Sequence, residues 1–147
     1  MVSAESSFGK AGFKVLVDIG TLKIPFHTNG ILVSESLLKS RRALAEKFTR
    51  AIIESIHYIK TDKDGTKAVI TKNLRVTDPE SLERAYQAYA PVFREAPYPD
   101  PEGVKTYLDD LARTNPKAAT ADPKSFVDAS FVRELENSGF IKRLYGK

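Results

Sequence analysis

Two histidines, His27 and His57, are the side chains of this sequence best suited to metal binding or proton transfer, and they lie thirty residues apart. Glu54 precedes His57 by three positions, which puts both side chains on one face of a helix and could supply two metal ligands. The alternative is a solvent-exposed pair with local contacts only. Asp109 and Asp110 fit an exposed helix surface in the same way. We therefore expect no metal site.

Sequence motifs of enzymes are also missing. The chain has no Gly-rich phosphate loop, no G-x-S-x-G nucleophile elbow and no H-E-x-x-H zinc motif. It has no cysteine, which excludes disulfides, thiolate metal sites and cysteine nucleophiles. We expect a protein that is not an enzyme and needs no cofactor.

A cluster of basic residues raises the question of nucleic acid, because residues 1–76 hold 13 Lys/Arg against 7 Asp/Glu. The cluster consists of Lys39, Arg41, Arg42, Lys47 and Arg50. Glu46 and Glu54 interleave with it, and no aromatic side chain is placed to stack on bases. We interpret the cluster as a solvated helix face and expect no nucleic-acid partner.

The elements that would position these residues begin with two short apolar runs of strand type. Phe13–Asp18 alternates as a strand with one buried face does, and Gly30–Val33 is continuous and partly β-branched. Two strands alone are marginally stable. We expect them to belong to a larger sheet, most of which this chain does not contain.

Helical periodicity dominates the rest. In the longest helix, Leu44, Phe48, Ile52, Ile56 and Ile59 fall on one stripe, widened by Ile53, that we expect to be buried. A turn is expected at Asp64-Gly65, a capping box at Thr77 with Glu80, and a loop over residues 115–125. The expected helical segments are 35–39 (capped by Ser34), 41–60, 66–74, one after Thr77, one from Pro101 (capped by Asp100) to Asn115, and 129–136 (capped by Asp128 and ended by Ser138-Gly139).

A length of 147 residues suits one domain, and we expect residues 1–147 to form one, with residues 1–12 as a flexible N-terminus. The N-terminus shows no basic region followed by an apolar one, so no secretory signal is expected in this chain. No apolar run approaches the length of a membrane span, and no membrane insertion is expected.

Two stretches of the sequence carry a family resemblance. "ESIHYIKTDKDGTKAVI" and "FVDASFVRELENSGFIKRLY", in this order, resemble the C-terminal part of bacterial ABC-transporter substrate-binding proteins. The branch is the nitrate/sulfonate/bicarbonate type, related to the proteins that bind thiamine pyrimidine precursors. The similarity runs from about residue 8 to the end.

The resemblance implies a type II periplasmic-binding-protein fold, in which two lobes close on a solute. The expected fold class is therefore α-rich α/β, with two short N-terminal strands and about six helices that form the C-terminal part of one lobe. It also implies a small anionic, sulfonate or pyrimidine-like solute, an ABC permease as partner, and a periplasmic location. Without a signal peptide, the chain as given would be cytoplasmic.

Family members carry a signal peptide, the first half of lobe one and all of lobe two before this region, so most of their binding residues cannot be assigned here. The loop between the expected strands offers His27, Thr28 and Asn29 as ligand-binding candidates for an oxyanion. The alternative is a purely structural loop, with Asn29-Gly30 in a left-handed turn.

A second function stays open: a truncated relative without ligand binding that acts as a helical, self-associating structural protein. Unpaired strand edges with apolar faces favour self-association. We therefore expect a homodimer or domain-swapped pair through residues 13–34.

Overall fold

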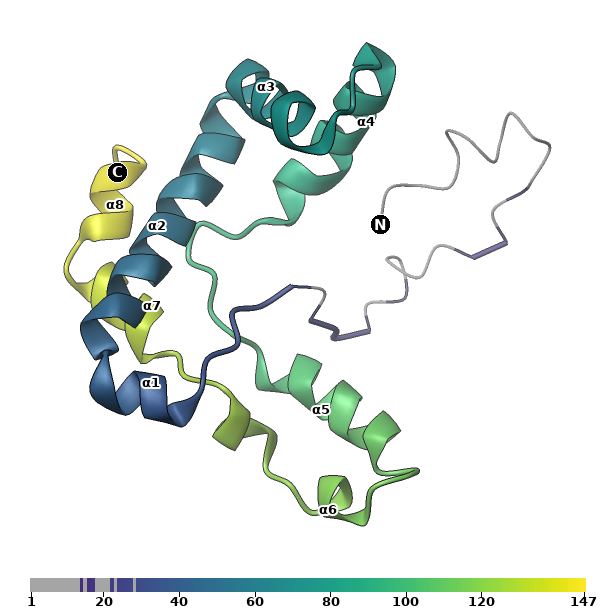
Figure 1. Cartoon of the computed structure of the whole chain (residues 1–147), viewed down its shortest axis with the longest axis vertical. Helices are drawn as coiled ribbons and strands as arrows, with labels where there is room; N and C mark the ends of the chain where they lie inside the picture. The colour runs from purple at the N-terminus through teal and green to yellow at the C-terminus, as the bar shows by residue number, and fades with distance from the viewer. Residues whose placement is uncertain (1–13, 15, 18–21, 23, 28) are drawn as a thin grey trace. The chain divides into compact units, whose positions relative to one another are not determined.

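The structure is a computed structural model, and it describes residues 14, 16–17, 22, 24–27 and 29–147. Of these residues 67% are helical, and none is in a strand (Figure 1). The longer helices are α1 (Glu35–Ser40), α2 (Arg42–Thr61), α3 (Lys63–Leu74), α4 (Pro79–Tyr89), α5 (Pro101–Leu111) and α7 (Ser130–Asn137). The shorter ones are η2 (Ala90–Val92), α6 (Pro116–Ala119), η3 (Pro123–Phe126) and α8 (Phe140–Leu144).

The predicted α/β class is wrong for the described chain. Residues 30–33 have no strand partner, and Lys14, Leu16 and Val17 lie outside any strand; the rest of the first predicted strand lies outside the described residues. An apolar run becomes a strand only when a second backbone completes its hydrogen bonds. Just before the second run, the carbonyls of Pro25 and His27 instead accept hydrogen bonds from side chains of α5.

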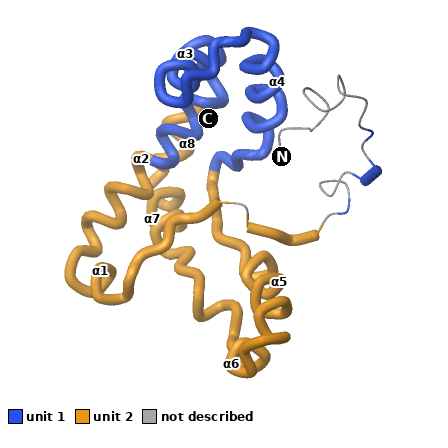
Figure 2. Tube along the Cα trace, turned by 45° about the vertical axis from the view of Figure 1, so that its right-hand side comes forward, with its two compact units in different colours: residues 1–22, 52–95 blue, residues 23–51, 96–147 orange. Residues whose placement is uncertain are grey.

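The chain groups into two compact units (Figure 2). Unit 1 is Met1–Leu22 with Ile52–Glu95, and unit 2 is Lys23–Ala51 with Ala96–Lys147. The boundary falls inside α2, so both units draw on one continuous helix. Because neither unit is a continuous stretch of sequence, the grouping does not test the prediction of a single domain.

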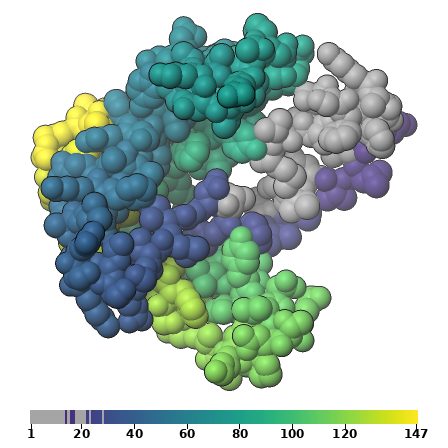
Figure 3. Space-filling model, viewed as in Figure 1, coloured from purple at the N-terminus to yellow at the C-terminus, as the bar shows by residue number. Residues whose placement is uncertain are grey.

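Unit 1 is built on the packing of α3 against α4, whose side chains form a continuous surface in Figure 3. Leu82 of α4 and Thr66 of α3 are buried, and Ala90 of η2 is buried at the end of α4. The Thr66 hydroxyl donates to the carbonyl of Asp62, so its burial leaves no polar group unsatisfied.

Unit 2 has its core where α7 packs on α8. Phe131, Val132 and Leu135 of α7 are buried together with Ile141 of α8. The spacing of the three α7 residues places them on one face of the helix, which explains why this short helix is stable in contact with its neighbour.

The predicted stripe of α2 is buried at Ile56 and at Ile53, in the second half of the helix, but not in the first half. Leu44 and Phe48 are about half exposed, whereas Ile53 is fully buried. On the first half of α2, the guanidinium groups of Arg42 and Arg50 stack on aromatic rings, 4.4 Å above Phe131 and 4.3 Å above Phe140. The residues of the basic cluster are all exposed, as predicted, and two of them also contact rings of α7 and α8.

Several predicted helix boundaries also move. Gly65 lies inside α3, not in a turn, and the helix is capped by Asp62, whose carboxylate accepts from the Gly65 amide at 2.8 Å. A Cβ on Gly65 would stand 2.0 Å from the Tyr58 hydroxyl oxygen, so the glycine permits close approach. Helix α4 is capped by Asp78 instead of Thr77.

The C-terminal third combines correct and incorrect boundaries. Asp100 caps α5 and Ser138 ends α7 as expected, and Gly139 has a left-handed φ of 73°. The loop expected over residues 115–125 contains two short helices, α6 and η3. Each begins with proline after a capping side chain, a combination that starts a helix even in a polar stretch.

Two further predictions concern the N-terminus and membrane insertion. The flexible N-terminus expected at residues 1–12 lies outside the described residues. Among the helices that are described, none has the length and apolar character needed to cross a membrane.

Candidate functional site

Residues 24–27, which we call the docked segment, lie against α5 within unit 2. The Thr106 hydroxyl donates to the carbonyl of Pro25 at 2.7 Å, and the Tyr107 hydroxyl donates to the carbonyl of His27 at 2.6 Å. The Phe26 and Tyr107 rings are tilted by 33° with centroids 4.6 Å apart, a favourable geometry for aromatic pairs. Side chains of one helix thus fix the backbone of an extended segment.

The His27 ring sits at the N-terminus of α5. Its Nε2 atom lies 2.6 Å from the carbonyl oxygen of Asp100 and 3.2 Å from the amide nitrogen of the same residue. A single ring nitrogen either donates or accepts, so a protonated Nε2 bonds the carbonyl and an unprotonated one bonds the amide. A Cβ on Gly103 would stand 2.5 Å from His27 Cδ2, which means that glycine is required for the ring to lie there.

The three predicted ligand-binding residues differ in exposure and in their contacts. His27 is half-buried and its Nε2 is engaged with Asp100, Asn29 is exposed, and Thr28 lies outside the described residues. Gly30 does not adopt positive φ, so the left-handed turn of the structural alternative does not occur at that residue. Their role in binding an oxyanion stays a prediction.

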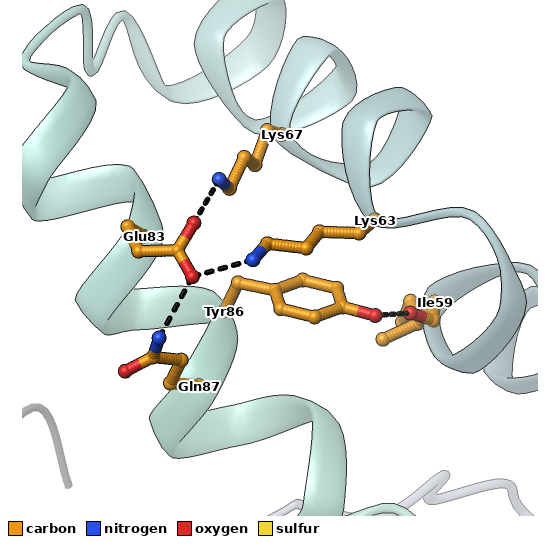
Figure 4. A network of polar contacts seen from close by, with 6 residues as sticks. All are labelled: Ile59, Lys63, Lys67, Glu83, Tyr86 and Gln87. Atoms are coloured by element: carbon orange, nitrogen blue, oxygen red, sulfur yellow. Dashed lines mark hydrogen bonds and ion pairs between the residues drawn. The ribbon is translucent and has the colours of Figure 1, made fainter.

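A second polar cluster, which sequence reasoning missed, joins α3 to α4 in unit 1 (Figure 4). The Glu83 carboxylate receives hydrogen bonds from Lys63 at 2.5 Å, from Lys67, and from the Gln87 amide at 2.8 Å. These donors stabilise the charged carboxylate, with the Lys63 bond the largest cause, and lower the pKa of Glu83 to about 2. The Glu83 bond in turn raises the pKa of Lys63.

Beside this cluster is a hollow of about 390 Å³, which we call the lysine hollow. It is lined by Lys60, Lys63, Tyr86, Gln87, Ala90 and Pro91. The Tyr86 hydroxyl donates to the Ile59 carbonyl at 2.8 Å, and Lys60 Nζ donates to the Phe93 carbonyl at 3.0 Å. The lining thus presents two ammonium groups, one amide and a largely apolar wall.

The sequence did contain a signal for this cluster. Lys63 and Lys67 are four residues apart on one helix, and Glu83 and Gln87 are four residues apart on the next. Residues at this spacing share a helix face. Side chains of two such pairs on neighbouring helices can meet, but only the structure shows that Lys63 and Lys67 both reach Glu83.

The candidate metal ligands are not gathered into a site in the described part of the chain, where no three His, Asp or Glu side chains are grouped to hold an ion. Asp109 pairs with Lys105 at 2.5 Å and Asp110 with Arg113 at 3.6 Å, both within α5 or at its end. These are the local surface contacts expected for such residues.

No family model matches this sequence, and no curated protein or solved structure is significantly similar to it.

Proposed function

We propose that this chain is part of a solute-binding protein that delivers a small anionic, sulfonate or pyrimidine-like solute to an ABC permease, without chemistry. Two sequence stretches support the proposal. "ESIHYIKTDKDGTKAVI" spans the end of α2 and most of α3, and "FVDASFVRELENSGFIKRLY" spans α7 and α8. Both resemble the C-terminal part of such proteins.

The observation that carries the proposal is the exposure of the residues that follow the docked segment. Leu32 is 97% exposed, and Ile31 and Val33 are each close to half exposed. Burying a large aliphatic side chain stabilises a protein by about 1.5–3 kcal/mol, so a run of three that face solvent marks a surface that more protein covers. In a two-lobed solute-binding protein, the remaining lobe structure would supply that cover.

The docked segment is the part of the proposed solute site whose backbone is held in place. Hydrogen bonds from Thr106 and Tyr107 hold its backbone on α5, and the exposed Asn29 follows two residues after His27. A polar side chain close to a hydrogen-bonded segment suits a ligand contact, because anchoring the nearby backbone reduces the conformational entropy lost when a ligand binds. In this proposal Asn29 donates to the anion and His27 positions the loop.

The proposal is tested by thermal unfolding of the 147-residue chain with nitrate, bicarbonate, methanesulfonate and an aminopyrimidine. A ligand that binds only the folded state at 100 times its dissociation constant stabilises it by about 2.7 kcal/mol, which raises the melting temperature measurably. We expect one of the four to do so, and Asn29→Ala to reduce the rise. Asn73→Ala, which removes an exposed amide from α3, is the matched control. No rise with any of the four would reject binding by this chain.

The second function, a self-associating structural protein, is favoured by the same exposed residues together with Leu16, which is 93% exposed. Here a second copy of the chain covers residues 13–34. The two functions differ in a simple observable: the solute-binding proposal predicts a ligand-dependent melting temperature, and this one predicts a concentration-dependent molar mass without any ligand.

A further inference from the structure

We infer that the lysine hollow is a binding site for a small aromatic anion, a single ring that carries a carboxylate or sulfonate group. The hollow is open to solvent, and its volume of about 390 Å³ lies at the lower end of the range of small-molecule sites, commonly 300–1,000 Å³. All of its lining residues belong to α2, α3, α4 and η2 of unit 1. The site therefore depends only on elements that pack within one unit.

The first argument is the placement of the two ammonium groups at the hollow. Lys60 Nζ is held by the Phe93 carbonyl and Lys63 Nζ by the Glu83 carboxylate (Figure 4). An ammonium has three hydrogens, so each lysine keeps donors beyond the bond that positions it. Two cations whose positions are already fixed favour an anion because less side-chain entropy is lost on binding.

The second argument is the aromatic and apolar part of the lining. The Tyr86 ring is fixed because its hydroxyl donates to the Ile59 carbonyl, and Lys63 Nζ lies 5.7 Å from the ring centroid. Ala90, which is buried, and Pro91 complete the lining with apolar atoms. A flat ring can pack on this surface while its anionic group reaches the lysines.

The third argument concerns Glu83, whose carboxylate already accepts hydrogen bonds from Lys63 and Lys67. Asp64 adds a second negative charge near Lys63. An incoming anion must share Lys63 with Glu83. Removing the Glu83 charge should therefore strengthen anion binding, whereas removing a lysine should weaken it.

The inference is independent of the proposed solute-binding function. The docked segment and Asn29 belong to unit 2, and the lysine hollow belongs to unit 1. A variant of Lys60 or Lys63 leaves the docked segment intact, and Asn29→Ala leaves the lysine hollow intact. Each proposal can thus fail while the other holds.

The test is an NMR titration of the 147-residue chain with benzenesulfonate, followed by the side-chain amide signal of Gln87. Sulfate supplies charge without a ring, benzyl alcohol supplies a ring without charge, and sodium chloride matches the ionic strength. We expect a saturable shift with benzenesulfonate alone. Lys60→Gln and Lys63→Gln should each weaken binding about fivefold, the effect of one partly exposed charge contact, and Glu83→Gln should strengthen it.

Lys72→Gln is the control, because it removes the same charge from an exposed position on α3. Equal weakening by Lys72→Gln would show attraction to net charge and overturn the site. An equal response to sulfate or to benzyl alcohol, or no saturable response, would also overturn it. Lys60 lies outside the Glu83 cluster, so Lys60→Gln decides the question if Glu83→Gln or Lys63→Gln unfolds the protein.

Discussion

The His27 ring and Gly103 form the tightest residue-level fit at the docked segment. Because a Cβ at Gly103 would stand 2.5 Å from His27 Cδ2, Gly103→Ala should expel the ring from the N-terminus of α5. Alanine favours the helix over glycine by about 1 kcal/mol, so α5 itself stays folded. We expect the His27 ring signals in NMR to move to unfolded-peptide positions.

Gly30→Ala provides the matched comparison for this prediction. A Cβ on Gly30 meets nothing within 4 Å, and its φ is not in the left-handed region, so the same chemical change carries neither clash nor strain. The His27 signals should stay unchanged in this variant. Unchanged signals in Gly103→Ala as well would show that the ring is not seated against the helix.

Between elements, the Glu83 cluster makes the contact of α3 with α4 dependent on pH. The folded-state pKa of Glu83, about 2, lies below its ordinary value of 4.5, chiefly because of the Lys63 hydrogen bond. A carboxylate with a lowered folded-state pKa contributes stability above its unfolded-state pKa and loses it as pH falls through the folded one. The free energy of unfolding should therefore drop between pH 4.5 and 2, and Glu83→Gln should remove this part of the drop.

Urea denaturation at a series of pH values measures this effect. At neutral pH, Glu83→Gln should be less stable than the parent chain, and most of that difference should vanish by pH 2. Glu80→Gln is the comparison variant, because Glu80 lies on the same helix but pairs only locally, with Arg84. If Glu80→Gln and Glu83→Gln change the pH profile alike, the cluster has no special part in joining the helices.

Comparison of these elements with the sequence shows which predictions local chemistry can support. Asp100-Pro101 and Ser138-Gly139 set helix ends correctly because capping needs only neighbouring residues. Asp64-Gly65 was misread as a turn because the reason for the glycine is the Tyr58 hydroxyl, a contact within the folded pair of helices. The strand predicted at Gly30–Val33 failed because pairing depends on a second backbone.

For the candidate functional sites, too, the sequence predicts single residues better than contacts between distant elements. His27 was identified as a chemically capable side chain, but its contact with Asp100 depends on a segment 73 residues away. The lysine hollow was missed because its residues come from four elements and carry no motif. The interpretation of the basic cluster as a solvated face agrees with the exposure of Arg42 and Arg50. The stacking of their guanidinium groups on Phe131 and Phe140 was not predicted, because such stacking has no sequence pattern.

On the scale of the whole molecule, the exposed apolar residues outside the two cores decide how this chain behaves in solution. Leu32, with 97% of its surface exposed, lies in the segment expected to self-associate, and Leu74, with 70% exposed, lies at the end of α3. Isolated exposed leucines are ordinary, whereas a run that includes Ile31 and Val33 forms a patch. A second copy covering that patch would remove water from all three residues at once.

We therefore expect the chain alone to be a dimer in light scattering at micromolar concentration, and Leu32→Gln to weaken the dimer. Full burial of a leucine is worth about 1.5–3 kcal/mol, so the dissociation constant should rise roughly ten- to a hundredfold. Leu74→Gln makes the same chemical change outside the patch and should leave the dimer intact. A monomer at every concentration would contradict this prediction, and so would equal weakening of the dimer by both variants. In either case a second copy of the chain does not cover residues 30–33.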